Sequence, residues 1–407
     1  MTSAGAVSDK VLNRVLLLLA PAITIVVATE FIVVGLLPLV SQEMHLPLAK
    51  AGQLVGWWAF SAAVAGPFVT LVVSRQSPHL TLIATLILFA IGNAIIAVTT
   101  SFDVMLLIRI IQGAMLPAFV SVGASVVTRL APPAERGKGL ARANIGFVLG
   151  VLLALPAGVA LAQGGDWRLS FVVLAVASLP MAALIAIFFP AIPQGEAPSI
   201  PSQIGLLRRS TFLANLALSV LLFAAMFAAY TYLGAWMEGA LGLSVWSVTL
   251  TLFLFGVAGL VGNVVAARIA DGAPLRATAI AILMLVASIN LAALVQGSIF
   301  LAAIPLALWG ISHTASVTLS QVRVTLAGNE APAFAMTMNI SAANLGIAIG
   351  AFGGGWLIDQ EGVGAIGLAP IGFAVFAIPL TVFIGRNVAR RATPTPASGS
   401  AHRWSPP

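Results

Sequence analysis

Cysteine is absent from the chain, which excludes disulfide bonds, cysteine-ligated zinc sites and iron–sulfur clusters. Charged residues are scarce, at 8%, whereas hydrophobic residues make up 60%. The mean hydropathy of +1.08 lies outside the usual balance of soluble globular domains and predicts a polytopic membrane protein. The net charge of +7 does not indicate nucleic-acid binding, because the basic residues lie in short loops between apolar runs.

Motifs for nucleotide binding and catalysis are also missing. No Walker A pattern occurs, so ion gradients are the expected energy source. An enzyme within the membrane would need paired acids or a nucleophile with its base, but the span interiors offer one Glu, one Arg and one His, all in separate spans. The sequence therefore favours a transporter over an enzyme, with no cofactor and no metal site.

Twelve apolar runs are long enough to cross a hydrocarbon core of about 30 Å. In chain order they cover 15–40, 51–73, 79–99, 104–128, 140–162, 169–190, 211–236, 245–267, 276–296, 299–322, 334–357 and 365–385. The loops between them are too short for a soluble domain. The first run lacks a small-residue cleavage site, so we expect it to be a retained helix. The predicted fold class is all-α, with twelve transmembrane helices.

The basic residues predict that both termini lie in the cytosol. With this topology, sixteen of the nineteen Lys and Arg residues fall inside, Arg323 among them, and only Lys50 and Arg168 fall outside. Arg109 remains within a span. One span more or fewer would move many of these basic residues to the outer side, so the distribution supports an even number of spans.

A short repeat divides the chain into halves. Asn144-Ile-Gly146-Phe-Val-Leu-Gly150 in span five recurs as Asn344-Leu-Gly346-Ile-Ala-Ile-Gly350 in span eleven. A parallel repeat of this kind places a substrate site at the midplane between the halves. We predict an N-terminal six-helix bundle over 1–190, a cytosolic linker over 191–210, a C-terminal six-helix bundle over 211–391 and a disordered cytosolic tail over 392–407.

Glu30 is the only acid within any of the twelve runs. An acid at the centre of a membrane helix costs about 2.5 to 3.5 kcal/mol on insertion scales, so a chain that keeps one there is expected to use it. Proton transport is the favoured use. A hydrogen bond between helices is the alternative.

Arg109 and Gln112 share one face of span four. Arg109 lies about 8 Å below the outer boundary, and Glu30 lies about 10 Å deep by the same helical rise. If the two helices adjoin, Arg109 favours the charged carboxylate and apolar surroundings favour the neutral one. We therefore predict that Glu30, Arg109 and Gln112 couple transport to protons. Alternatively, Arg109 snorkels outward or caps backbone carbonyls.

Small residues recur at intervals of four in spans five and eleven. The stripes comprise Gly146, Gly150 and Gly158, with Pro156 as a predicted kink, and Gly346, Gly350 and Gly354. Such faces permit close helix contact, either for helices that slide or for static packing. Both interpretations remain open.

Spans four, seven and ten carry the candidate substrate cavity. Its residues are Phe119, then Phe223, Phe227 and Tyr230, then Trp309, His313 and Ser316. An aromatic stripe at helical spacing is also typical of ordinary packing. His313 is either a substrate or proton ligand or a hydrogen-bonded interior residue.

Together these residues resemble the major facilitator superfamily, specifically the twelve-helix drug:proton antiporter branch and its sugar-efflux-like (arabinose-efflux-like) members. Thr29-Glu-Phe31 with Gly35 is similar to that subgroup's first helix, and Arg109-x-x-Gln112-Gly113 matches the fourth-helix motif associated with proton coupling. The stretch containing Pro156, Gly158, Trp167, Arg168 and Phe171 resembles the antiporter motif, with Ala154 and Ala162 where glycines are common. The resemblance covers nearly the whole chain.

The cytosolic gating loop departs from the family pattern. The family has Asp-Arg-x-Gly-Arg-Lys there, whereas this chain has Ser74-Arg75-Gln-Ser-Pro-His79. Only Arg75 survives from the motif. Arg268 and Asp271 in the opposite half are expected to supply part of this gate.

The resemblance implies two six-helix bundles that rock around a central cavity. It also implies a secondary active transporter that exports a small organic molecule, such as a sugar, drug or nucleoside, in exchange for protons. A proton-coupled importer and a substrate sensor without turnover remain alternatives. The implied partners are a small-molecule substrate, protons and the lipid bilayer, without nucleic acid. We expect a monomer in a bacterial inner membrane.

Overall fold

The computed structural model describes residues 2–73, 75–132, 135–164, 166–190, 205–270, 272–295 and 297–392. Twelve helices in these ranges are long and apolar enough to cross a membrane, which confirms the predicted fold class. Asp271, residues 191–204 of the predicted linker and residues 393–407 of the predicted tail lie outside the described residues.

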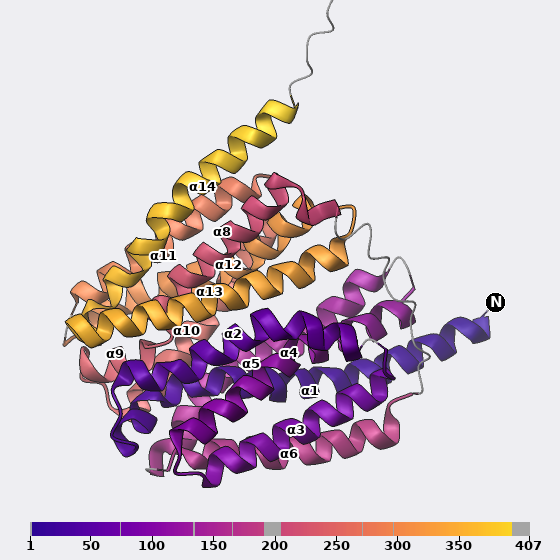
Figure 1. The fold of residues 1–407 in the computed structure, drawn as a ribbon, viewed down its shortest axis with the longest axis horizontal. Helices are drawn as coiled ribbons and strands as arrows, with labels where there is room; N and C mark the ends of the chain where they lie inside the picture. Colours follow the sequence, from indigo (N-terminus) through magenta and orange to yellow (C-terminus); the bar gives the residue numbers. More distant parts are fainter. Residues whose placement is uncertain are drawn as a thin grey trace, which may run out of the picture.

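The helices follow the predicted runs closely. Those of the first half are α1 (Thr2–Glu43), α2 (Leu48–Val73), α3 (Pro78–Val98), α4 (Phe102–Leu130), α5 (Arg136–Leu161) and α6 (Arg168–Phe188). Those of the second half are α8 (Ser210–Tyr230), α9 (Leu233–Gly239), α10 (Val245–Ile269), α11 (Pro274–Leu294), α12 (Ile299–Ala327), α13 (Pro332–Glu361) and α14 (Leu368–Ala392). In Figure 1, the first set occupies the lower part of the view and the second set the upper part.

Helices that occupy the same place in the order of each half form equivalent pairs in the two halves. In the first half α1 packs on α5, α2 on α4, and α3 on α6. In the second half α8 packs on α13, α10 on α12, and α11 on α14. The repeat noted in the sequence therefore lies in helices that have equivalent partners.

The two glycine stripes lie in these equivalent contacts. Each of the glycines Gly146, Gly150 and Gly158 of α5 faces α1, and each of Gly346, Gly350 and Gly354 of α13 faces α8. A Cβ added at Gly350 would lie 2.5 Å from the Ala224 carbonyl oxygen, and one at Gly150 would lie 2.8 Å from the Cβ of Val27. Because no side chain fits, both stripes hold backbones close together. Pro156 is buried inside α5.

The halves meet through α2 with α13 and through α5 with α10. At the predicted outer end, Gly56 accommodates Phe352 of α13, whose ring lies 5.6 Å from that of Trp57. Tyr232, which follows α8, is completely buried against Gly52 and donates a hydrogen bond to the Ala351 carbonyl at 2.8 Å. Aromatic side chains from one half thus occupy notches left by glycines of the other.

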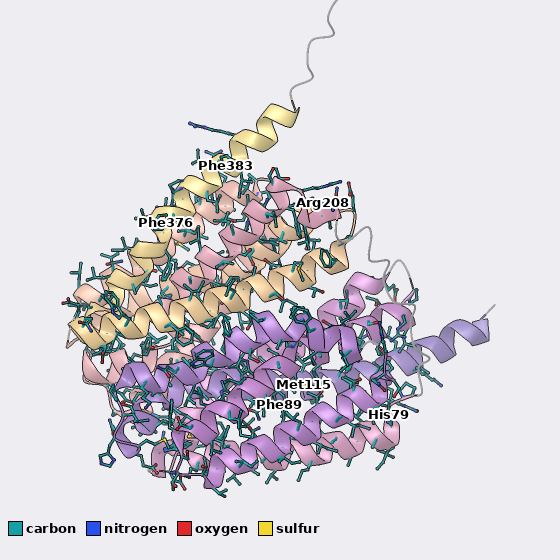
Figure 2. The ribbon with its side chains drawn as sticks, viewed as in Figure 1. His79, Phe89, Met115, Arg208, Phe376 and Phe383 are labelled. Carbon is teal, nitrogen blue, oxygen red and sulfur yellow. The ribbon has the colours of Figure 1, made fainter. Side chains whose placement is uncertain are left out.

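Large apolar side chains cover the outside of the helices, as expected for surfaces that face lipid. Figure 2 shows Phe376 and Phe383 projecting from α14, and these side chains are 67% and 54% exposed. A soluble protein would bury such side chains.

The ends of three predicted spans show how the helices relate to the apolar runs, and one placement, that of Arg323, needs correction. The predicted seventh span, 211–236, lies within one candidate membrane span, Ser210–Gly239, which a turn at Thr231 and Tyr232 divides into α8 and α9. Helix α1 continues beyond the predicted run 15–40 and ends at Glu43. Arg323, which we sorted to the cytosolic loops, lies inside α12 and is 2% exposed, because other polar side chains bury it.

Candidate functional site

Arg109 is buried in the middle of the first half, where it is 1% exposed. Its guanidinium donates to the backbone carbonyls of Thr29 at 2.6 Å and Glu30 at 2.9 Å, and its Nε donates to the Leu54 carbonyl at 3.3 Å. The guanidinium carbon also lies 3.9 Å from the ring centre of Trp58, a cation–π geometry. One side chain of α4 therefore ties α1 and α2 together, as in the carbonyl-capping alternative.

Glu30 lies beside this cluster and is 7% exposed. The guanidinium of Arg109 bonds its backbone oxygen, not its carboxylate. Among the described side chains, no Lys, Arg or His nitrogen lies within 4.0 Å of the Glu30 carboxylate oxygens. The Glu30 carboxylate is therefore buried without an ion pair to any described side chain.

Gln112 extends the cluster toward α3. Its Nε2 donates to Asn93 Oδ1 at 3.2 Å, and Asn93 Nδ2 donates to the Thr29 hydroxyl at 3.2 Å. All three side chains are completely buried. A continuous polar chain, which we call the α1–α3–α4 network, therefore links Gln112 through Asn93 and Thr29 to the carbonyl that Arg109 binds. Thr29 and Asn93 were not predicted as members of this network, because an isolated Asn in an apolar run does not reveal its partner.

An aromatic cluster surrounds His313 in the second half. The ring of His313 lies 4.4 Å from that of Tyr230, 5.5 Å from that of Phe227 and 6.1 Å from that of Phe255. Phe223 stacks on Phe227 at 6.4 Å, and Trp309 meets Phe255 edge-on at 5.7 Å. The structure thus brings together the candidate aromatic residues of α8 and α12.

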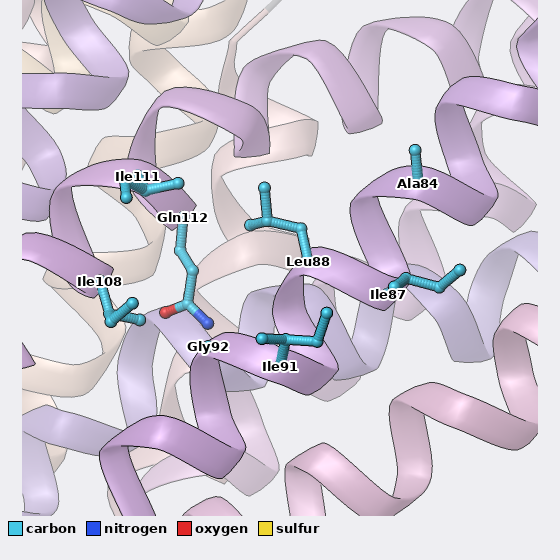
Figure 3. Close-up of a pocket in the computed structure, with 8 residues that line it drawn as sticks. All are labelled: Ala84, Ile87, Leu88, Ile91, Gly92, Ile108, Ile111 and Gln112. Carbon is cyan, nitrogen blue, oxygen red and sulfur yellow. The ribbon is translucent and has the colours of Figure 1, made fainter. Parts of the chain in front are cut away.

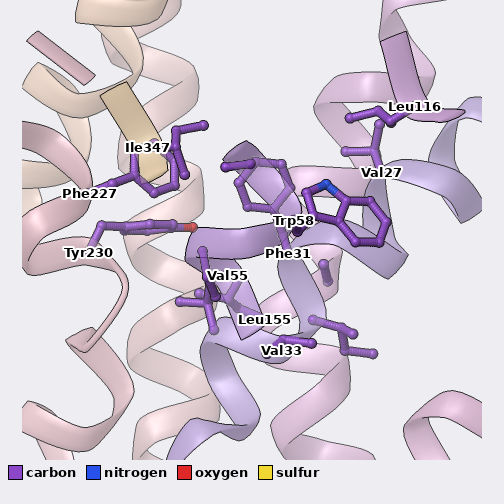
Figure 4. Close-up of a cluster of buried hydrophobic side chains, with 14 of the residues drawn as sticks. Val27, Phe31, Val33, Val55, Trp58, Leu116, Leu155, Phe227, Tyr230 and Ile347 are labelled. Atoms are coloured by element: carbon purple, nitrogen blue, oxygen red, sulfur yellow. The ribbon is translucent and has the colours of Figure 1, made fainter. Parts of the chain in front are cut away.

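This cluster reaches the first half through Phe31, the residue after Glu30. The rings of Phe31 and Phe227 lie 6.2 Å apart. Figure 4 shows Phe31 and Trp58 of the first half facing Phe227, Tyr230 and Ile347 of the second. The residue that follows Glu30 in α1 therefore contacts the aromatic surface where the two halves meet.

Several buried polar atoms along α12 have no hydrogen-bond partner within the described chain. Trp309 Nε1, His313 Nδ1 and Ser316 Oγ are the three of these atoms that lie at or near the aromatic cluster, and Arg323 Nε and Thr325 Oγ1 lie further along the helix. The first three residues fall at helical spacing on one face of α12. Buried polar atoms are rarely left unpaired, so these three suit a site in which a ligand or water supplies the partner.

Other candidates lie apart from this cluster. Phe119 is completely buried in α4, but no ring stacks on it among the described residues. Arg75 and Arg268 are exposed, in the turn after α2 and in the last turn of α10 respectively. In this divergent gating loop, Ser77 instead caps α3 by accepting the Leu80 N–H at 3.2 Å.

A second buried arginine, Arg323, was missed as an interior residue. Its Nη1 donates to the Asn215 carbonyl and side-chain oxygens, both at 2.7 Å, and its Nη2 donates to Ser219 Oγ at 3.0 Å. Ser219 donates to Asn339 at 2.8 Å. This cluster joins α8, α12 and α13, and a count of basic residues by loop could not have identified it.

Glu43, Trp167 and Arg168 form a polar cluster at the predicted outer end. Glu43 accepts a hydrogen bond from Trp167 Nε1 at 2.6 Å and forms an ion pair with Arg168. Arg168 also donates to the Thr99 carbonyl at 3.2 Å. The cluster fastens the ends of α1, α3 and α6 to one another.

The Major Facilitator Superfamily profile matches residues 19–332. The chain belongs to this family. It is 31% identical to the inner membrane transport protein YdhP of Escherichia coli (strain K12) over 352 residues, which is 86% of this chain and 90% of the relative. It is also 28% identical to a probable sugar efflux transporter of Pasteurella multocida (strain Pm70) over 357 residues, or 88% of each chain.

Solved structures support the same fold. A bacterial homologue of the human lysosomal transporter Spinster, in an inward-facing and occupied conformation, superposes with a TM-score of 0.79 over 95% of this chain and 99% of that one, at 16% identity. The nucleoside transporter NupG superposes with a TM-score of 0.70 over 90% and 99%, at 13% identity. The protein is therefore a multi-pass membrane transporter of this superfamily, and its relatives are transporters rather than enzymes.

Proposed function

We propose that this transporter exports a small organic molecule in exchange for protons by alternating access, with Glu30 as the proton-binding residue. The observation that supports this proposal most directly is the position of Glu30. Its carboxylate is buried and forms no ion pair with the described side chains, while Arg109 binds its backbone carbonyl and its neighbour Phe31 contacts the aromatic cluster. A change in its protonation can therefore influence both the α1–α3–α4 network and the contact between the halves.

The aromatic cluster around His313, which Phe31 contacts, supports a substrate site close to the Glu30 segment of α1. Aromatic rings offer apolar faces to a ligand, and the unpaired Trp309 Nε1, His313 Nδ1 and Ser316 Oγ offer hydrogen bonds. The described ring neighbours of His313 are Phe227, Tyr230 and Phe255, none of which carries a charge. We therefore propose a neutral or weakly basic substrate with a ring and several polar groups, in the range of the sugars and nucleosides named for similar proteins.

Proton exchange would supply the driving force. Each pH unit across the membrane contributes about 1.4 kcal/mol per proton, which supports about a tenfold substrate gradient. A membrane potential adds about 2.3 kcal/mol per 100 mV for each charge that crosses.

The test uses purified protein in liposomes that enclose a pH-sensitive dye. Sugars, nucleosides and amphipathic drugs are added in turn, and a substrate that is exchanged for protons changes the internal pH. The Glu30→Gln variant should lose this proton flux but retain exchange of labelled for unlabelled substrate, which needs no net proton movement. Glu361→Gln, at the exposed end of α13, is the matched control and should behave as wild type.

Full proton coupling in Glu30→Gln would contradict the assignment. Proton-driven uptake into right-side-out vesicles would instead favour an importer. Substrate binding without exchange in wild-type liposomes would favour a sensor.

A further inference from the structure

A groove of about 500 Å³ lies between α3 and α4, on the outside of the first half. Figure 3 shows it lined by Ala84, Ile87 and Ile91 of α3 and by Ile108 of α4. Ile87 and Ile91 are 41% and 56% exposed, although both are large and apolar. Because α3 and α4 are membrane-spanning helices, the groove opens toward the lipid bilayer.

One end of this groove contains a polar group. Gln112 lines it near Gly92 and Ile108, whereas Ala84 and Ile87 line the opposite end (Figure 3). Gln112 is completely buried, and its Oε1 has no hydrogen-bond partner in the described chain. Its Nε2 is already used, in bonds to Asn93 and to the Phe89 carbonyl.

Gly92 makes this position of Gln112 possible. A Cβ added at residue 92 would lie 2.7 Å from Gln112 Nε2 and 2.9 Å from an Ile108 methyl carbon. The amide therefore lies directly against α3, and the hydrogen bonds of Nε2 fix which of its two ends is the unpaired oxygen.

The unpaired oxygen distinguishes possible occupants. A plain acyl chain gains little from leaving the bilayer for an apolar groove, because lipid tails are as apolar as the groove. A buried acceptor without a donor is unfavourable in hydrocarbon, where no water can replace the missing partner. A molecule that combines an apolar body with one donor satisfies both ends of the groove.

We propose that the α3–α4 groove binds a neutral lipophilic alcohol from the bilayer. Its hydroxyl donates a hydrogen bond to Gln112 Oε1, and its hydrocarbon body lies along α3 toward Ala84. This site is separate from the aromatic cluster and does not depend on the proposed direction of transport. Since Gln112 also holds Asn93, and Asn93 holds Thr29, an occupant acts on the α1–α3–α4 network from the lipid side.

The probe is decanol with a photoreactive diazirine in its tail, added to the full-length protein in lipid nanodiscs. Peptide mapping by mass spectrometry should locate the label in 84–92 and 108–112. Unlabelled decanol should compete about three- to tenfold better than decane at equal mole fraction in the bilayer, which is the range expected for one neutral hydrogen bond.

Two variants separate the groove from its polar end. Ile91→Trp fills the groove and should abolish labelling there, whereas Val98→Trp is a matched control, since Val98 lies on the same helix and is 79% exposed. Gln112→Leu retains the volume but removes the acceptor, so decanol should then compete no better than decane.

Equal labelling of the Ile91→Trp and Val98→Trp variants would overturn the proposal. So would equal competition by decane and decanol in the wild-type protein, because the groove would then be an ordinary lipid-filled surface. Both results can be read without the Gln112 variant, so the test does not depend on whether that variant folds.

Discussion

Replacement of Arg109 by Met should destabilise the protein through the loss of contacts between helices. Met has a similar length and an apolar end, so the change removes the guanidinium and leaves most of the volume. The lost contacts are the hydrogen bonds to the carbonyls of Thr29, Glu30 and Leu54, and the Trp58 cation–π contact.

The size of the effect follows from these contacts. Hydrogen bonds between membrane helices average about 0.6 kcal/mol, and a desolvated cation–π contact contributes about 2 kcal/mol. The carbonyls keep their own helical N–H partners, so no polar group is left unsatisfied. We expect the free energy of unfolding to fall by about 4 kcal/mol. Arg109→Lys should recover less than half of this loss, because one ammonium cannot reproduce the planar fork.

Steric trapping in bicelles measures this free energy directly. Arg209→Met is the matched control, since Arg209 pairs with Glu330 at 2.7 Å and both side chains are about half exposed. An exposed pair of this kind contributes at most about 1 kcal/mol. The pH dependence of transport by folded Arg109→Lys, measured in the same liposome assay, tests the proposed coupling role.

A loss below about 1 kcal/mol for Arg109→Met would refute the energetic reasoning. Equal stability of Arg109→Lys and wild type would refute the importance of the fork geometry. Normal pH dependence in Arg109→Lys would remove the guanidinium from the coupling mechanism but leave its structural role intact.

Three further predictions concern other contacts. Gly350→Leu should abolish folded yield in detergent, because an added Cβ meets a backbone oxygen at 2.5 Å, whereas Gly372→Leu should express normally, because nothing lies within 4 Å of its added Cβ. Arg323→Met should lower the free energy of unfolding by about 2 kcal/mol by steric trapping, from three lost hydrogen bonds at about 0.6 kcal/mol each; an unchanged value would contradict the bonding. In Gly56→Leu, the added Cβ would lie 2.5 Å from the Phe352 ring, so the ring should be displaced and the outer ends of the two halves should separate. Maleimide added from outside should then label an introduced Ile347→Cys faster. Because the chain has no native cysteine, an unchanged labelling rate would directly refute this last prediction.

Much of the candidate site could be anticipated from residue type and depth. Glu30 and Arg109 stood out because charges are rare in apolar runs, and their similar depth suggested contact. The structure changed the form of that contact, since Arg109 binds backbone carbonyls and not the Glu30 carboxylate. The choice between these acceptors depends on helix rotation and side-chain rotamer, which sequence spacing does not specify.

The second half illustrates the same limit. The spacing of His313 and Ser316 placed them on one helix face, but the aromatic residues around His313 come from α8 and α10 as well. Arg323 was misplaced because the positive-inside rule counts residues near helix ends without reporting whether they face a loop or a neighbouring helix. Its partner Asn215 lies 108 residues away.

The sequence by itself determined the membrane environment, the twelve spans and the repeated glycine stripes. These properties are local, because the hydropathy of a run and the spacing of small residues do not depend on distant parts of the chain. Only the tertiary structure decided which helices the stripes contact, which groups Arg109 and Arg323 bind, and where an apolar groove ends at Gln112. Those features arise where helices distant in sequence pack together, so they depend on the relative rotation and depth of both partners.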